Sequence, residues 1–302
     1  MAIVSDKVRR ARPLLGTFVE IEAAGAAKSE MNAAVDAAFE AVAGAHRLMS
    51  FHEPDSDVSR LNREACLRPT RVHAWTFQVL EAAVEMHRRS KGIFDIAVAP
   101  TLQAMALLPR RNDDPAIATE ARSFDAIELL EGQTVRFRQA DVRIDLGGIA
   151  KGFAVDRALE VLRRFNVPSG VVNAGGDLAA FGDTQTIHVR NPRDPRRLIC
   201  RVEVTDEGLA STARRFDPFQ SAETTGSAII DPGTRKPTHA IDGTTVRAPS
   251  CMVADALTKI VMISGTDASE LLEHYCASAL LISTDGDVQI TPDWHHAVYR
   301  AA

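Results

Sequence analysis

The segment DLGGIAKG at residues 145–152 constrains the fold more than any other part of the sequence. The stretch before it, VRFRQADVRI at residues 135–144, alternates apolar and polar side chains as strands do. Behind it Ala154, Ala158, Leu159, Leu162 and Phe165 recur at helical spacing, and GVVNAGGDLAAFG at residues 170–182 carries a second glycine pair. This order predicts strand, sharp turn, helix and second strand, with side-chain-free backbone at both strand exits.

The chemistry of residues 145–152 suits a phosphate or a pyrophosphate. Gly147 and Gly148 let the backbone approach a ligand closely, and the following helix is expected to present free N–H groups and its positive dipole end. Lys151 adds a mobile cation. The segment contains neither the P-loop pattern nor the Rossmann glycine pattern. A tight turn with a solvated lysine explains the same spacing, so the segment alone leaves both interpretations open.

The rest of the chain predicts an α+β fold in which helices pack on mixed sheets. A strand is expected at residues 15–23, helices at 31–50, 75–90 and 250–265, and a hairpin around Asp285 and Gly286. We expect one domain over residues 1–302, without a separable small domain.

Composition and charge limit the classes of partner. The net charge of −5 argues against nucleic acid, whose binding usually depends on clustered Lys and Arg. The basic residues Arg9, Arg10 and Arg12 are interpreted as solvated surface. The four cysteines contain no C-x-x-C pair, so reduced thiols are expected. No run is apolar enough for a signal peptide or for membrane insertion, which predicts a cytoplasmic protein, or a periplasmic one if a leader has been removed.

Six ordered segments together resemble the ApbE family of FAD:protein FMN transferases and span nearly the whole chain. They are LLGTFVEIEA at 14–23, MSFHEPDSDVSRLN at 49–62, GIFDIAVAPTL at 92–102, DLGGIAKGFAVDRA with VNAGGDL at 145–178, SAIIDPGTRKP at 227–237 and APSCMVADALTKIVMISG at 248–265. The resemblance implies the ApbE-like, T-fold-related architecture. It also implies transfer of FMN from FAD to a threonine or serine of an acceptor protein, with release of AMP and with Mg²⁺ as the metal.

The resemblance also implies roles for individual positions. FAD contacts fall on Leu15, His52, Phe94, Asp95, Asp145, Lys151 and Ile229. The metal ligands fall on the carbonyl group of Gly148, on Asp255 and, with a slight shift, on Thr258. Lys151 and Asp255 are the expected catalytic residues.

Two positions depart from the family pattern. Ala228 stands where the family has a histidine implicated in catalysis, and His239, eleven residues later, is an alternative base. Lys259 stands where relatives place a threonine one helical turn after the metal-binding aspartate. One hypothesis is that the ammonium group of Lys259 occupies the metal position; the other is that Thr258 serves as the ligand.

These departures leave three functions open. The first is the FMN transferase. The second is a protein that binds FAD for storage or delivery and has lost efficient transfer. The third is a pyrophosphatase that hydrolyses FAD to FMN and AMP, with water in place of the acceptor hydroxyl.

Overall fold

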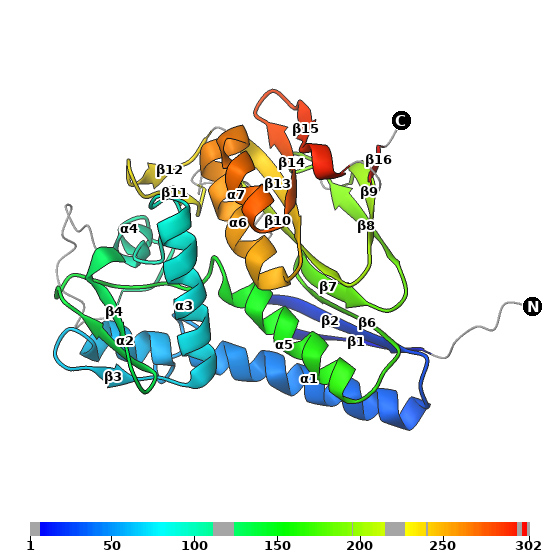
Figure 1. Cartoon of the computed structure of the whole chain (residues 1–302), viewed down its shortest axis with the longest axis horizontal. Helices are drawn as coiled ribbons and strands as arrows, with labels where there is room; N and C mark the ends of the chain where they lie inside the picture. Colours follow the sequence, from blue (N-terminus) through cyan, green and yellow to red (C-terminus); the bar gives the residue numbers. More distant parts are fainter. Residues whose placement is uncertain are drawn as a thin grey trace, which may run out of the picture.

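An antiparallel eight-stranded sheet is the centre of the molecule (Figure 1). The computed structural model describes residues 7–110, 124–194, 196–214, 227–239, 241–294 and 298–300. The strand order is β1-β2-β6-β7-β10-β13-β14-β15. The bounds are β1 (Lys7–Leu14), β2 (Thr17–Ala24), β6 (Ser169–Ala174), β7 (Asp177–Phe181), β10 (Glu207–Ala213), β13 (Ile241–Ala248), β14 (Ser278–Ser283) and β15 (Val288–Ile290).

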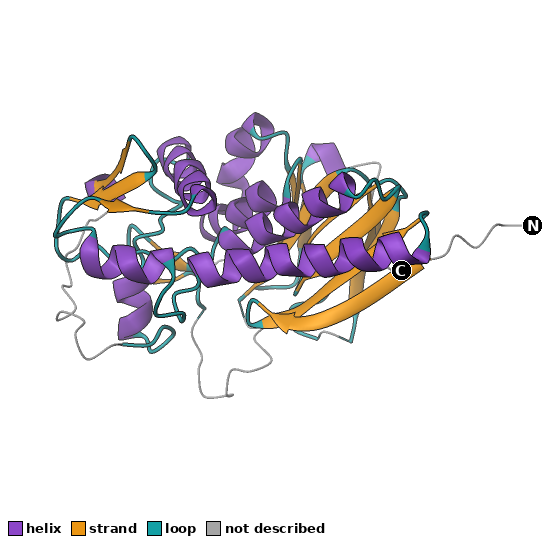
Figure 2. Ribbon diagram, turned by 90° about the horizontal axis from the view of Figure 1, so that it is seen from below, coloured by secondary structure: helices purple, strands orange, loops and turns teal. Residues whose placement is uncertain are grey.

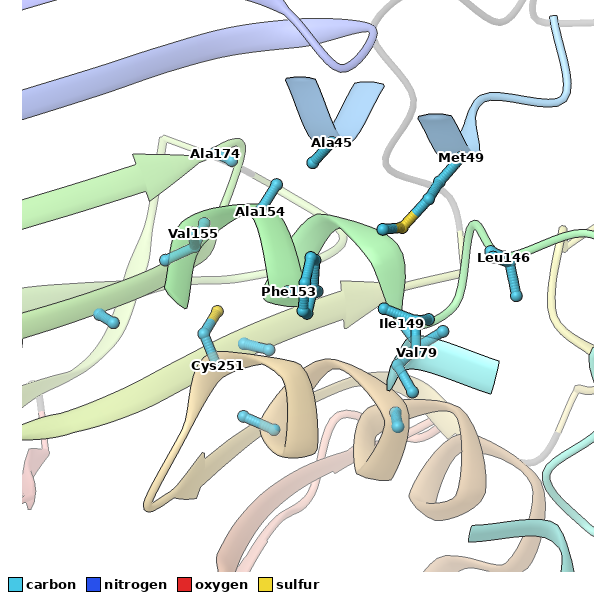
Figure 3. Packing of buried hydrophobic residues seen from close by; sticks show 14 of the residues in the cluster. Ala45, Met49, Val79, Leu146, Ile149, Phe153, Ala154, Val155, Ala174 and Cys251 are labelled. Carbon is cyan, nitrogen blue, oxygen red and sulfur yellow. The ribbon is translucent and has the colours of Figure 1, made fainter. Parts of the chain in front are cut away.

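Long helices cover one face of this sheet. They are α1 (Lys28–Met49), α5 (Ala150–Arg164) and α6 (Cys251–Ser264), and the short α7 (Ser269–His274) follows α6. Figure 2 shows α1 running the length of the sheet and beyond it. Its Ala-rich stripe lets α5 approach closely, and in Figure 3 Ala45 and Met49 of α1 lie over Phe153 and Ala154 of α5. These side chains belong to the main hydrophobic core.

A second layer covers the other face at the middle of the sheet. It is a three-stranded sheet of β8 (Gln185–Arg190), β9 (Leu198–Val204) and β16 (Val298–Arg300). Leu178, Leu209 and Leu280 of the large sheet form a separate core with Val202 of β9 and Trp294. All five residues of β7 are buried because both faces of the strand are covered.

The remaining elements lie together at the left of Figure 1. They are α2 (Asp57–Glu64), α3 (Ala74–Arg89), α4 (Ala99–Ala104), a small sheet of β3 (Thr70–Arg71), β5 (Thr134–Phe137) and β4 (Ile127–Leu130), and the two-stranded β11 (Ile230–Asp231) and β12 (Lys236–Pro237). Short 3₁₀ turns occupy Phe124–Ala126, Gly265–Ala268 and Pro292–Trp294. Among the described helices, none is both long and apolar enough to cross a lipid bilayer.

The predicted α+β class is confirmed, and the expected helices form within a few residues of their predicted ends. The hairpin around Asp285 and Gly286 forms as β14 and β15. The four cysteines are free thiols. The single-domain organisation stays a prediction.

Of the strands predicted in residues 135–144, the first forms as β5, whereas the one directly before residue 145 is wrong. Residues 142–145 join no sheet, because a side chain takes the place of a neighbouring strand. Asn62 accepts from Ile144 N at 2.8 Å and donates to Ile144 O at 2.9 Å, and Asp145 N donates to Ile96 O at 2.8 Å. The alternating pattern reports burial of Val142 and Ile144, which a fixed loop provides as well as a sheet.

Three sequence predictions gain detail from the structure. The strand expected after α5 forms as β6 and ends at Gly175 and Gly176, and the residues after this glycine pair form an additional strand, β7. Phe165 follows the last turn of α5 and is 42% exposed. The solvated basic residues near the N-terminus lie on an edge strand, β1, where Arg9 and Arg10 pair with carboxylates of the neighbouring β2 and α1.

Candidate active site

The crossing of α5 and α6 fixes the position of the candidate site. Gly152 makes this crossing possible, because a Cβ atom there would lie 2.3 Å from the carbonyl oxygen of Cys251. Each helix contributes a carboxylate to the first turn of the other. Asp255 Oδ2 accepts from Gly152 N at 3.0 Å, and Asp156 accepts from Cys251 N and Met252 N at 2.8 and 2.9 Å. These reciprocal caps satisfy N–H groups that helix ends leave without partners.

The expected free N–H groups at the start of α5 are therefore partly wrong. Gly152 N is taken by Asp255, and Ala150 N donates to Leu146 O at 2.9 Å. An anion at this helix end would meet the ammonium group of Lys151 more directly than the backbone amides.

The second oxygen of Asp255 takes part in a polar cluster on α6. Asp255 Oδ1 accepts from Lys259 Nζ, one helical turn later. The same Nζ lies 3.0 Å from Thr258 Oγ1 and 3.2 Å from Thr212 Oγ1 of β10. Gly148 lies alongside, since a Cβ on it would be 3.4 Å from Lys259 Cγ.

Lys151 forms a second ion pair, with Asp177 at the start of β7. The side chain of Asp177 is fully buried, and its Oδ1 has no hydrogen-bond partner in the part of the chain that is described. Sequence reasoning missed Asp177 as a site residue, although it follows the glycine pair of VNAGGDL directly. Its position directly after Gly175 and Gly176 is the sequence feature that could have identified it.

The turn before Asp177 lies against the β1–β2 hairpin. Gly175 and Gly176 have φ values of 68° and 104°, and Gly176 N donates to Asn173 Oδ1 at 3.0 Å. A Cβ on Gly175 would lie 2.6 Å from Thr17 Oγ1. Leu15, at the tip of the hairpin, also has a positive φ of 56°, so two tight turns meet here.

Burial and neighbouring charges shift the pKa values of Lys151, Asp177 and Asp255. Burial by itself lowers the pKa of Lys151, but the carboxylates of Asp177 and Asp255 outweigh burial, and the net shift is upward. Burial likewise opposes ionisation of Asp255, yet Lys259 and Lys151 lower its pKa. Burial raises the pKa of Asp177. The ammonium group of Lys151 therefore stays charged at neutral pH.

Of the next two predicted residues, Phe94 lies beside Gly148. Phe94 Cε2 lies 3.8 Å from the position of a Cβ on Gly148, and His87 Nδ1 is 2.7 Å from the carbonyl oxygen of Phe94. Asp95 is half-buried and accepts from Ala97 N at 2.6 Å, and burial raises its pKa.

Asp145 accepts from Gly147 N at 3.1 Å and closes the glycine turn. Burial also raises the pKa of this carboxyl, while the neighbouring His52 opposes the rise. His52 itself is exposed.

The segment that carries Ala228 packs on the C-terminal half of α6. Thr238 Oγ1 donates to Met262 O at 3.0 Å, and Thr238 N donates to Ile229 O at 2.9 Å. Ala228 is exposed, and His239 is exposed with its Nδ1 3.4 Å from Arg214 Nη1. Arg214 itself is held by Asp242 at 2.6 Å.

The structure thus brings Phe94, Gly148, Lys151, Asp255 and Thr258 into one cluster with Lys259. In the described part of the chain, no side-chain hydrogen bond or ion pair joins Leu15, Asp95 or Ile229 to that cluster. Asp177 of β7 belongs to it without having been predicted, and Thr212 joins it from β10, a strand far away in the sequence.

Comparison with known proteins shows the family of the chain. Residues 15–281 match the model of the ApbE family, so the chain belongs to the ApbE family. A curated relative named FAD:protein FMN transferase, from Vibrio cholerae, is 26% identical over 280 residues, which cover 87% of this chain and 83% of the relative. A protein of the same name from Haemophilus influenzae is 28% identical over 258 residues, 78% of this chain and 75% of the relative.

Solved structures confirm the fold. The crystal structure of the ApbE protein of Thermotoga maritima superposes with a TM-score of 0.83 at 22% identity, covering 95% of this chain and 98% of that one. The flavin transferase ApbE of Vibrio cholerae gives a TM-score of 0.79 at 22% identity, covering 96% and 98%.

Proposed function

We propose that this protein is an FAD:protein FMN transferase, which moves FMN from FAD to a threonine or serine of an acceptor protein and releases AMP. Membership of the ApbE family and the names of the curated relatives support this proposal. The observation that carries it is Lys151, an ammonium group on the first turn of α5, beside the glycine turn and 34% exposed. A charge in this position suits the diphosphate of FAD.

The reaction exchanges one phosphorus–oxygen bond for another. The bond between the FMN phosphorus and the bridging diphosphate oxygen breaks, and AMP leaves with that oxygen. A new bond forms between the same phosphorus and the acceptor hydroxyl, which gives up its proton. Such a transfer depends mainly on positioning and on stabilising the developing negative charge.

In this proposal Lys151 supplies charge, and the other residues position the helix or contact FAD. Lys151 neutralises the diphosphate, and Asp255 holds the first turn of α5 through Gly152 N. The remaining FAD contacts are proposed at Leu15, His52, Phe94, Asp95, Asp145 and Ile229. Phe94 offers an aromatic face beside Gly148, which suits the flavin ring.

The second candidate is a protein that binds FAD and has lost efficient transfer. The observation that favours it is Ala228, whose methyl group can neither accept a proton nor bond to phosphate. Hydrolysis of FAD to FMN and AMP is the third candidate and differs only in the nucleophile.

The test is separation of FAD, FMN and AMP by chromatography after incubation of the purified protein with FAD, with and without Mg²⁺ and in the presence of a cell extract as acceptor source. AMP together with protein-bound flavin supports the transferase. AMP with free FMN supports the pyrophosphatase, and bound but intact FAD supports the binding protein. The double variant Lys151→Met with Asp177→Leu, which leaves no unpaired buried carboxylate, is the matched control and should bind no FAD.

Restoration of the family pattern gives a second test. Ala228→His combined with Lys259→Thr should accelerate Mg²⁺-dependent AMP release by at least about tenfold, the lower range of what general acid–base catalysis contributes. An unchanged rate in this variant would contradict the mechanism proposed for these positions.

A further inference from the structure

The side chain of Lys259 lies where the expected metal ligands converge. It is 15% exposed, and its Cγ and Cε lie 3.4 and 3.6 Å from the position of a Cβ on Gly148. Its Nζ contacts Asp255, Thr258 and Thr212. The groups that the family resemblance assigns to Mg²⁺ thus surround an ammonium group.

The hydrogens of this cluster can be placed without conflict. Thr258 Oγ1 donates to the carbonyl oxygen of Asp255 at 2.7 Å, so it accepts from Thr212 Oγ1, which is also 2.7 Å away. Each hydroxyl oxygen then retains a lone pair for Lys259 Nζ. Together with Asp255 Oδ1, these two oxygens take up all three N–H donors of the ammonium group.

The same assignment leaves little for a divalent ion. Both oxygens of Asp255 are occupied, one by Lys259 and the other by Gly152 N. Mg²⁺ requires oxygen ligands at about 2.0–2.1 Å in octahedral geometry, and here it would also lie beside a positive charge. Within the described ranges, no group of three His, Cys, Asp or Glu side chains could hold a metal ion. The residues present do not fit Mg²⁺.

We propose that Lys259 is a built-in replacement for the divalent cation, so that this protein binds the diphosphate of FAD without a metal. This inference rests on the proposed function. Lys259 balances the charge of Asp255, and its three donors are all used within the protein. Lys151 is more exposed, and Asp177 is its sole hydrogen-bond partner among the described residues, so its other N–H groups can reach phosphate oxygens.

The first experiment measures metal binding without FAD. Mn²⁺ is titrated into the full chain and followed by electron paramagnetic resonance, for the unmodified protein, Lys259→Thr and Lys7→Thr. Lys7 pairs with Glu22 at 3.2 Å on the exposed edge strand and serves as the control. We expect one Mn²⁺ per chain in Lys259→Thr, and affinity at least about tenfold weaker in the other two proteins. One tightly bound Mn²⁺ in the unmodified protein would overturn the proposal.

The second experiment measures FAD binding by flavin fluorescence in EDTA and in Mg²⁺. The dissociation constant of the unmodified protein should change by less than about twofold between the two conditions, whereas that of Lys259→Thr should improve at least about tenfold with Mg²⁺. An unmodified protein that needs Mg²⁺ for FAD would refute the role of Lys259, whether or not the variant folds. Failure of every protein to bind FAD would instead refute the proposed function, and the Mn²⁺ titration would still decide between ammonium and metal.

Discussion

The substitution Gly152→Ala should destabilise the protein strongly, although alanine is the better helix former. The added Cβ would lie 2.3 Å from the carbonyl oxygen of Cys251, 2.6 Å from its carbonyl carbon and 2.7 Å from Met252 Cα. Real Cβ atoms essentially never approach other heavy atoms below 3.0 Å, so α5 and α6 must move apart. All three contacts are backbone atoms, and no side-chain rotation can relieve them.

The expected loss follows from two opposing effects. Alanine gains about 1 kcal/mol of helix propensity over glycine. Overpacking of a well-filled core costs about 1–3 kcal/mol, and a contact between two backbones belongs at or above the upper end. Separation of the helices also lengthens the bond from Gly152 N to Asp255, and loss of such a cap costs about 1 kcal/mol. The free energy of unfolding should therefore fall by about 3 kcal/mol.

The assay is urea denaturation followed by circular dichroism, with Gly148→Ala as the matched control from the same glycine segment. A Cβ on Gly148 meets only Lys259 and Phe94 side chains, at 3.4 Å or more. The control should lose less than about 1 kcal/mol. Equal stability of Gly152→Ala and the unmodified protein would refute the close crossing of α5 and α6.

Three further predictions follow from the buried charges. Lys151→Met should lower the free energy of unfolding by about 3–5 kcal/mol because it leaves the Asp177 carboxylate buried and unpaired, and the double variant with Asp177→Leu should recover stability in urea but not FAD binding. Burial raises the pKa of Asp156 from 3.8 to about 6, so the native state binds this proton more tightly than the unfolded chain does. Stability should therefore decrease by up to about 3 kcal/mol as the pH rises through this interval, a slope that Asp156→Asn should flatten in pH-dependent denaturation. Asp242→Ala should cost about 3 kcal/mol, since it strips the mostly buried Arg214 of its carboxylate, and Arg214→Met in the same background should restore part of that loss in thermal unfolding.

Local patterns in the sequence predicted the helices and one half of the site. The Ala-rich stripe of α1 and the apolar spacing of α5 depend on neighbours three and four residues away, which the sequence displays directly. Asp255 and Lys259 are also one turn apart on a helix, so their contact was predictable.

Partners that are distant in sequence were not predictable from such patterns. Asp177 reaches Lys151 across 26 positions, and Asn62 holds Ile144 across 82. Thr212 joins the site because β10 lies beside α6, a neighbourhood that depends on the strand order of the whole sheet. The periodicity of the sequence does not indicate such pairings. The segment before Asp145 therefore resembles a strand, although the side chain of Asn62 rather than a neighbouring strand bonds to its backbone.

The two oxygens of Asp255 have different roles, one in the fold and one in the site, and this affects how variants of the protein should be interpreted. Oδ2 holds the first turn of α5, whereas Oδ1 faces Lys259 and the cluster of hydroxyl groups. Substitution of Asp255 will therefore disturb the packing of α5 on α6 as well as the site. A loss of activity in such a variant does not show by itself that Asp255 takes part in the reaction. The hydrogen bonds of Lys259 go to Asp255, Thr258 and Thr212, and none of them holds α5 against α6. Residue 259 can therefore change, in the laboratory or over evolution, with less damage to the fold than residue 255, and the chemistry of the site can change with it.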